Sequence, residues 1–117
     1  MNKYERVIEE LTTTGTSKMK VFGNSMTPIL ESGVLLTFVK QEEYEVGDIV
    51  FAKVKGRYID AHKITKISPE RGYMIANNHN WENGWTRMIY GKAISAEYQD
   101  GTTKQLTKPK TEENENN

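Results

Sequence analysis

Residues 21–33 read VFGNSMTPILESG, and they place Ser25 between a glycine-bearing turn and a Met-Thr-Pro segment that no helix tolerates. Two interpretations of Ser25 follow. It is either a turn residue whose hydroxyl caps its neighbours, or a nucleophile held at the end of a strand. A serine hydroxyl is a weak nucleophile near neutral pH unless a base takes its proton, so the second interpretation requires a base from elsewhere in the chain.

The candidate bases are His62 and Lys63, in the segment YIDAHKITKI at residues 58–67. In a regular strand alternate residues share a face, so only one of the two can face Ser25. One face would carry Tyr58, Asp60, His62 and Ile64, and the other Ile59, Ala61 and Lys63. Histidine, with a reference pKa of about 6.5, is mostly neutral at pH 7, whereas lysine must be lowered from about 10.4 in a nearly dry site. The comparison favours His62.

Composition narrows the function classes. The chain has 117 residues, enough for one domain with a modest core, and its 16 basic and 16 acidic residues leave no net charge. No global field therefore attracts nucleic acid, and the basic cluster KVKGRY at residues 53–58 is interpreted as a solvated hairpin. The absence of cysteine excludes disulfides, thiol nucleophiles and cysteine-based zinc sites.

The chain carries no pattern typical of a membrane segment. Its longest apolar run, GVLLTFV at residues 33–39, is far shorter than the roughly 18 residues that cross a bilayer. Glu5, Glu9 and Glu10 stand where a signal peptide needs an apolar centre. We therefore expect no membrane span and a cytoplasmic protein.

The first residues predict a helix. Tyr4, Val7, Ile8 and Leu11 follow the spacing that places apolar side chains on one helical face, and Gly15 can adopt the left-handed conformation that ends a helix. We assign residues 1–16 to an N-terminal amphipathic helix.

From residue 17 the pattern changes to short β-rich runs separated by turn signals, which favours a mainly β fold with hairpins. The runs lie at residues 18–23, 34–40, 48–56, 57–67, 72–78 and 88–99. Lys55-Gly56 and Asn83-Gly84 are predicted as tight turns. Residues 17–99 form the predicted domain. Residues 100–117 have Leu106 as their only aliphatic residue apart from the ring of Pro109, and they are predicted to be a disordered polar tail.

Three blocks together resemble a known family. VFGNSMTPILESG, VGDIVFAKVKG at residues 46–56 and AHKITKI at residues 61–67 look like the shared core of signal peptidases and LexA-type self-cleaving repressors. The resemblance covers about residues 18–96 and implies a LexA/signal-peptidase-like β-rich fold with one short N-terminal helix. It also implies that Ser25 is the nucleophile and that Met26 lies beside the substrate groove. His62 falls at the position of the base, as in the histidine-type signal peptidases, whose His-Arg pair resembles His62-Lys63.

The segment that would supply the residue orienting the histidine matches the family pattern only in part. Histidine-type enzymes carry a Gly-Asp-Asn-Asn segment, whereas residues 74–85 here read MIANNHNWENGW. Asn77 and Asn78 match that segment, but Ala76 stands at the aspartate. We expect Glu82, the nearest carboxylate, to orient the base, with Asn80 as the amide alternative. An acidic third member holds the tautomer of the base and stabilises the imidazolium, so a weaker one would lower the rate.

The sequence-based hypothesis is a serine endopeptidase that acts on a protein or peptide substrate without a cofactor. Ser25 attacks, His62 transfers the proton, and the backbone N–H of Ser25, with Gly23 or Asn24, holds the oxyanion. The expected oxyanion and groove residues are Gly23, Asn24, Met26 and Pro28. The alternative is a catalytically inactive module with the peptidase fold that binds a partner chain, as a phage or mobile-element protein could do.

Other polar and aromatic residues suggest weaker hypotheses. His79, Glu82 and Asp60 could be imagined around a metal ion, but two histidines without a helical His-Glu-x-x-His motif are a poor signal, and we expect no metal. Trp81 and Trp85 flank Asn83-Gly84 as hairpin-packing residues or as walls of a substrate groove.

Overall fold

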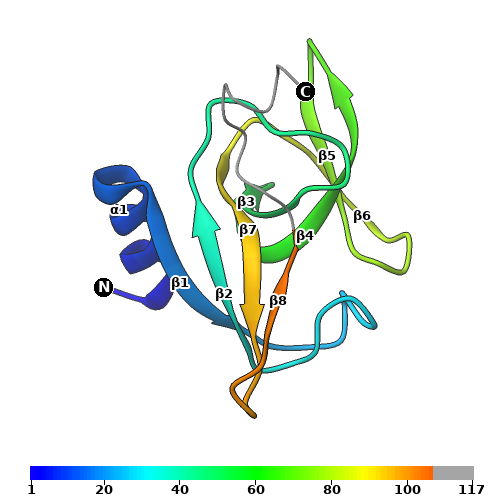
Figure 1. Cartoon of the computed structure of the whole chain (residues 1–117). Coiled ribbons are helices and arrows are strands. Elements are labelled where there is room, and N and C mark those ends of the chain that lie inside the picture. The colour runs from blue at the N-terminus through cyan, green and yellow to red at the C-terminus, as the bar shows by residue number, and fades with distance from the viewer. Residues whose placement is uncertain (107–117) are drawn as a thin grey trace, which may run out of the picture.

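The structure, a computed structural model, describes residues 1–106. Within them one helix is followed by eight strands (Figure 1). The elements are α1 (Lys3–Thr14), β1 (Thr16–Val21), β2 (Val34–Val39), β3 (Ile49–Val54), β4 (Arg57–Ser68), β5 (Gly72–Ala76), β6 (Glu82–Thr86), β7 (Ile89–Glu97) and β8 (Thr103–Gln105).

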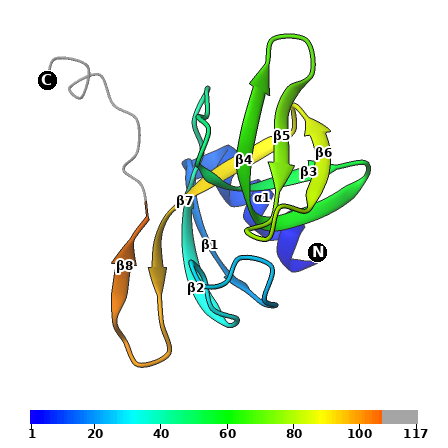
Figure 2. The ribbon, with the colours of Figure 1, turned by 90° about the vertical axis from the view of Figure 1, so that its right-hand side faces the viewer.

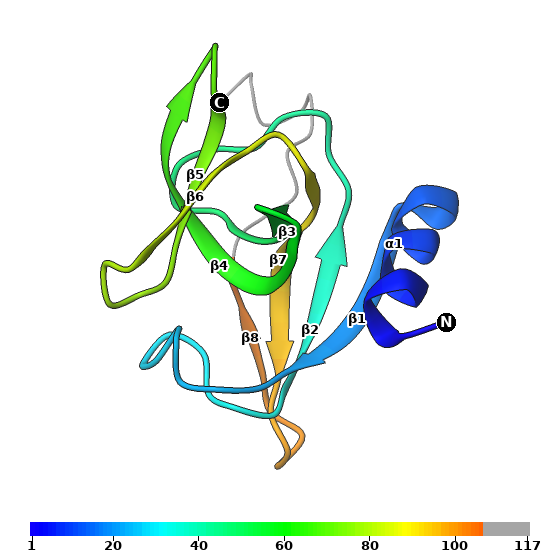
Figure 3. The same ribbon diagram turned by 180° about the vertical axis from the view of Figure 1, so that it is seen from behind.

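Helix α1 begins and ends with specific capping residues. The Asn2 side chain accepts a hydrogen bond from the Glu5 backbone N–H, and the Glu5 side chain accepts one from Asn2 in return. Gly15 ends the helix with a φ of 82°. The helix buries Val7 and Leu11 against the sheet, as the apolar spacing predicted. Figure 3 shows α1 beside β1 at one edge of the molecule.

The strands form one curled antiparallel sheet in the order β1-β2-β7-β3-β4-β5-β6, and β8 pairs with β7 off this path. Figure 2 shows β8 extending β7 on one side of the molecule, apart from β4, β5 and β6. The prediction of a mainly β fold with one short N-terminal helix is confirmed.

The core lies on both faces of the central strand β3. Phe51 packs into a cluster with the α1 residues Val7 and Leu11, whereas Val50 and Ala52 face a second cluster on the other side. Val50, Phe51 and Ala52 have no solvent exposure. Successive β3 side chains point to opposite faces, and both faces are covered, so consecutive residues of this strand are buried and apolar. The other strands are arranged around it and carry the loops of the site.

Two sequence predictions about the chain path are corrected. Asn83-Gly84 is part of β6, not a turn, because the chain reverses earlier, at Asn80, where φ is 68°. Within the segment predicted as a disordered polar tail from residue 100, Thr103–Gln105 form β8. Its backbone pairs with β7, which needs no apolar side chains, and Leu106 packs against the core. The part of that predicted tail at residues 107–117 lies outside the described residues.

The predicted alternation along β4 is also corrected. Val50 pairs with His62 but Ala52 pairs with Ile59, so β4 holds one extra residue at this point and contains a β-bulge. As a result Tyr58 and Ala61 pack against the same core cluster, although a regular strand would place them on opposite faces. The bulge changes the direction of the strand just before His62.

Gly72 supports a testable prediction about stability. Its φ is 91°, and an added Cβ would collide with the Thr86 carbonyl oxygen of β6. We expect Gly72→Ala to lower the free energy of unfolding by about 2–4 kcal/mol. The cost of a left-handed backbone conformation for alanine and the cost of the steric clash with Thr86 add together. Gly101→Ala is the matched control. Gly101 has nearly the same φ, 90°, but nothing within 4 Å of the added Cβ, so we expect a loss of only about 1–2 kcal/mol. Equal losses in urea unfolding would contradict the steric contribution.

Candidate active site

Ser25 lies in the loop of residues 22–33 that joins β1 to β2. The loop is held at both ends and in the middle. Gly33 N–H donates to the Val21 carbonyl at 2.7 Å, and Leu30 N–H donates to the Met26 carbonyl at 2.9 Å. Val21 before Ser25, and Met26 and Leu30 after it, are buried in the core cluster. Buried anchors on both sides of a half-buried Ser25 give its hydroxyl a defined position.

The Ser25 hydroxyl contacts a histidine on a different strand. His62 Nε2 is 3.1 Å from Ser25 Oγ, and His62 Nδ1 is 2.7 Å from Asn83 Oδ1. An amide oxygen can only accept a hydrogen bond, so this contact assigns the ring proton to Nδ1. Nε2 then presents its lone pair to the serine hydroxyl, which is the tautomer a general base requires.

Asn83, rather than the expected Glu82 or Asn80, contacts the histidine ring, and this corrects the sequence-based choice. Glu82 Oε2 lies 3.3 Å from Lys66 Nζ, and both side chains are largely exposed. Asn80 is an exposed residue of the turn before β6. Ile75 pairs with Gly84 and Ala76 with Glu82, so Asn83 is the extra residue of a β-bulge in β6, and its side chain is the one that reaches His62.

Sequence reasoning missed Asn83 because Asn83-Gly84 is typical of a hairpin turn. The signal that could have identified it is the run of turn-forming residues just before it. Asn77 Oδ1 accepts hydrogen bonds from the backbone N–H groups of His79 and Trp81, at 2.8 Å and 3.0 Å, and so closes the turn that precedes β6. That turn leaves Asn83 as the second residue of the strand.

The turn between β5 and β6 also holds the Ser25 loop. Asn78 N–H donates to the Ser25 carbonyl at 2.8 Å, and Asn78 Nδ2 donates to the Thr27 carbonyl at 2.9 Å. Lys63 Nζ donates to Asn78 Oδ1 at 3.3 Å. Lys63 therefore contacts the site through Asn78, while His62 contacts Ser25 itself. Figure 1 shows this turn above the β1–β2 loop.

His79 forms part of the same support. Its Nε2 lies 3.1 Å from the Asn24 carbonyl oxygen and 3.3 Å from Thr27 Oγ1. The metal arrangement considered for His79, Glu82 and Asp60 is not assembled, since Glu82 pairs with Lys66. Over residues 1–106 no three histidine or carboxylate side chains are grouped as metal ligands.

Two backbone donors beside the hydroxyl are available. Among the described residues, the N–H groups of Asn24 and Ser25 donate to no acceptor. Gly23 differs, because its N–H donates to Ser32 Oγ at 2.9 Å. Of the two expected helpers of Ser25, Gly23 and Asn24, Gly23 therefore has an N–H that is already hydrogen-bonded.

Ser25 opens on a small depression of about 10 Å³. Its lining residues include Gly23 and Met26 of the loop and Asp60 and Ala61 of β4. The exposed Pro28 is not among its lining residues. Burial raises the pKa of the nearby Tyr4 hydroxyl, and the Asp60 carboxylate raises it further.

The two tryptophans have different surroundings. Trp81 is 68% exposed and lines a hollow of about 440 Å³ that also includes Asn83. The Arg71 guanidinium lies over the Trp85 ring, 5.5 Å from its centroid. Trp81 is thus in a position to form a groove wall, whereas Trp85 packs against Arg71.

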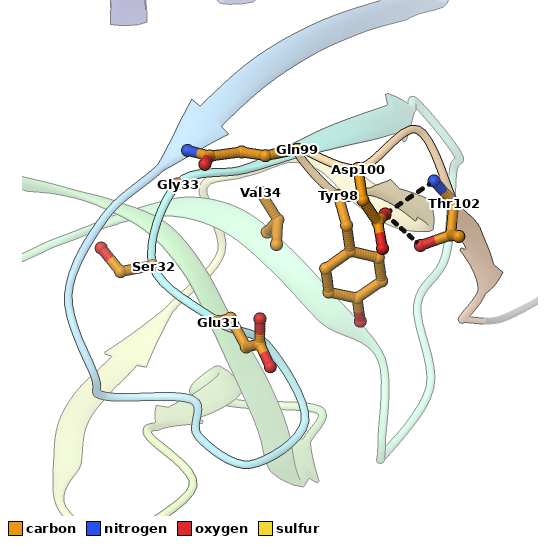
Figure 4. A pocket seen from close by; sticks show the side chains of 8 residues that line it. All are labelled: Glu31, Ser32, Gly33, Val34, Tyr98, Gln99, Asp100 and Thr102. Atoms are coloured by element: carbon orange, nitrogen blue, oxygen red, sulfur yellow. Dashed lines mark hydrogen bonds between the residues drawn. The ribbon is translucent and has the colours of Figure 1, made fainter.

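A third hollow, of about 490 Å³, lies between Glu31–Val34 and the β7–β8 turn (Figure 4). Its walls include the Tyr98 and Val34 side chains, with Glu31 beside them. Two hydrogen bonds from Thr102, from its hydroxyl and its backbone N–H, lower the pKa of the Asp100 carboxyl. Neither Ser25 nor His62 is among the lining residues, so this hollow is separate from the Ser25 and His62 pair.

Comparison with known proteins gives one family. The sequence model of the Peptidase S24-like family matches residues 2–106, nearly all of the part that the structure describes. No curated protein matches the chain. The described residues include no helix with the length and apolar character needed to cross a membrane.

Proposed function

Because the chain belongs to the Peptidase S24-like family, we propose that it is a serine endopeptidase in which Ser25 and His62 cleave a peptide bond. The observation that supports this function is the continuous pair of hydrogen bonds from Ser25 through the His62 ring to Asn83, at 3.1 Å and 2.7 Å. A serine that only capped a turn would have no need of a histidine held in the tautomer of a base.

The proposed reaction begins with Ser25 Oγ attacking the substrate carbonyl carbon as His62 Nε2 takes the hydroxyl proton. The tetrahedral intermediate collapses to an ester on Ser25, and His62 transfers the proton to the departing amine. Water then attacks the ester with His62 again acting as base, which releases the acid and restores the serine.

The developing oxyanion is assigned to the free N–H groups of Ser25 and Asn24. One such donor contributes about 100-fold to 1,000-fold to the rate, so the loop geometry matters as much as the base. The Asn78 hydrogen bonds to the Ser25 and Thr27 carbonyls restrict the movement of those donors. The Asn24 carbonyl accepts hydrogen bonds from the Thr27 N–H and hydroxyl. In a trans peptide unit the carbonyl and the N–H point in opposite directions, so the Ser25 N–H of the same unit points away from Thr27.

A serine-reactive fluorophosphonate tests this function without knowledge of the substrate. We expect one covalent adduct, located on Ser25 by mass spectrometry of the digested protein. Ser25→Ala should abolish the adduct, whereas Ser68→Ala, which removes a hydroxyl from the β4–β5 turn, should retain it. An unlabelled, folded protein would contradict the peptidase proposal and favour a peptide-binding module with the same fold.

A further inference from the structure

The hollow that contains Trp81 lies between the β3–β4 hairpin and β6 and has a volume of about 440 Å³. Its lining is mixed: Trp81, Tyr58, Ile59 and Val54 contribute aromatic and aliphatic surface, and charged or polar side chains form the rest. This space is large enough for a bulky side chain, in contrast to the depression of about 10 Å³ at Ser25. We name it the Trp81 hollow.

The Trp81 hollow lies next to the Ser25 and His62 pair. Asn83 lines the hollow and also accepts the hydrogen bond from His62, whose other nitrogen faces Ser25. The His62 ring and its two hydrogen bonds separate the hollow from Ser25 Oγ. The path from Ser25 Oγ across the His62 ring to Asn83 is about as long as two to three residues of extended peptide, at about 3.3 Å per residue. His62 must protonate the departing amine, so the peptide that passes it lies on the leaving-group side.

The rim of the hollow is positively charged. Lys55 and Arg57 line it, and neither has an ion-pair partner among residues 1–106. The Lys55 stem lies across Gly84, where an added Cβ would be 3.1 Å from Lys55 Cε, so its ammonium group is held over β6. The carboxylate on the rim, Glu82, is already paired with Lys66. A peptide residue that reaches this rim is therefore complementary if it is acidic.

We propose that the Trp81 hollow is the specificity subsite on the leaving-group side of the substrate. It takes a bulky apolar side chain about two residues beyond the cleaved bond, and Lys55 and Arg57 bind an acidic residue next to it. This proposal rests on the proposed peptidase function, because it assigns the direction in which the substrate runs past His62.

Binding to full-length Ser25→Ala protein separates recognition from catalysis. The probes are three fluorescein-labelled, C-terminally amidated peptides measured by fluorescence anisotropy: Ala-Ala-Ser-Phe-Asp, Ala-Ala-Ser-Ala-Asp and Ala-Ala-Ser-Phe-Lys. We expect the first to bind about tenfold more tightly than the second, because the phenylalanine ring leaves water. We expect it to bind about threefold more tightly than the third, because an exposed ion pair contributes little.

Second-site variants of the Ser25→Ala protein identify the wall and the rim. Trp81→Ala should remove the advantage of phenylalanine, and the exposed side chain makes this change compatible with folding. Lys55→Glu combined with Arg57→Glu should reverse the preference between aspartate and lysine. Val46→Ala, which truncates an exposed apolar side chain that does not line the hollow, should keep both preferences.

The outcomes distinguish the two proposals. Equal affinities for the three peptides, or an undiminished phenylalanine preference in Trp81→Ala, would overturn the subsite even if Ser25 is labelled by the phosphonate. Peptide discrimination by a protein whose Ser25 resists the phosphonate would overturn the peptidase function instead, and with it the leaving-group assignment.

Discussion

Replacement of His62 by alanine is expected to lower the rate of phosphonate labelling and of peptide cleavage by about 1,000-fold or more. The reason is that His62 Nε2 is the base in contact with Ser25 Oγ, at 3.1 Å, and without it the hydroxyl keeps its proton. The rate of covalent labelling measures this loss directly, and cleavage of an internally quenched peptide library measures it for turnover. Added imidazole should restore part of the labelling rate in His62→Ala by entering the vacated space.

Lys63→Met is the discriminating variant for this prediction, because Lys63 is the other candidate base in the segment YIDAHKITKI. Lys63 Nζ is bonded to Asn78 Oδ1, so its loss should loosen the Ser25 loop without removing the base. We expect a loss clearly smaller than that of His62→Ala. A larger loss in Lys63→Met, or labelling that is unaffected by His62→Ala, would contradict the Ser25 and His62 pair.

The sequence predicted the features that depend on local pattern. The apolar spacing of α1 and the β-rich run at residues 34–40 are properties of single segments, and the structure has a helix that buries Val7 and Leu11 and strand β2 at these places. The proximity of Ser25 and His62 was predicted from the two blocks of the family resemblance. The structure brings these residues together across 37 positions of sequence.

The features that the sequence did not predict depend on pairing between distant segments. The β-bulge in β4 is set by the pairing of β3 with β4, and no residue type in YIDAHKITKI requires it. The pairing of β8 with β7 joins backbone groups, so its polar side chains gave no signal. Asn83 was assigned to a turn because Asn-Gly favours one locally, whereas the structure places it in a β-bulge between Glu82 and Gly84, which both pair with β5.

Asn83 supplies the second large prediction, because it is the residue that positions His62. Asn83→Ala removes the acceptor 2.7 Å from His62 Nδ1, and the ring can then adopt the tautomer with its proton on Nε2. We expect the cleavage rate to fall by about 100-fold, mainly in kcat, since the wrong tautomer cannot accept the serine proton. The ¹⁵N chemical shifts of the His62 ring report the tautomer. They should change from a protonated Nδ1 to a mixture of the two forms, which a general loss of stability would not produce.

Asn83→Asp tests the same contact in the opposite direction. A carboxylate oxygen at the position of Asn83 Oδ1 would keep the tautomer and add a charge-assisted hydrogen bond to the imidazolium that forms during attack. We expect a rate increase of about tenfold, because this charge is present only on the way to the transition state. Glu82→Gln is the comparison variant. It removes a neighbouring carboxylate that pairs with Lys66 at 3.3 Å, and we expect a much smaller change in rate. If Glu82→Gln reduced the rate more than Asn83→Ala did, the carboxylate favoured by the sequence would orient His62 during catalysis, and the contact at Asn83 would describe only the resting site.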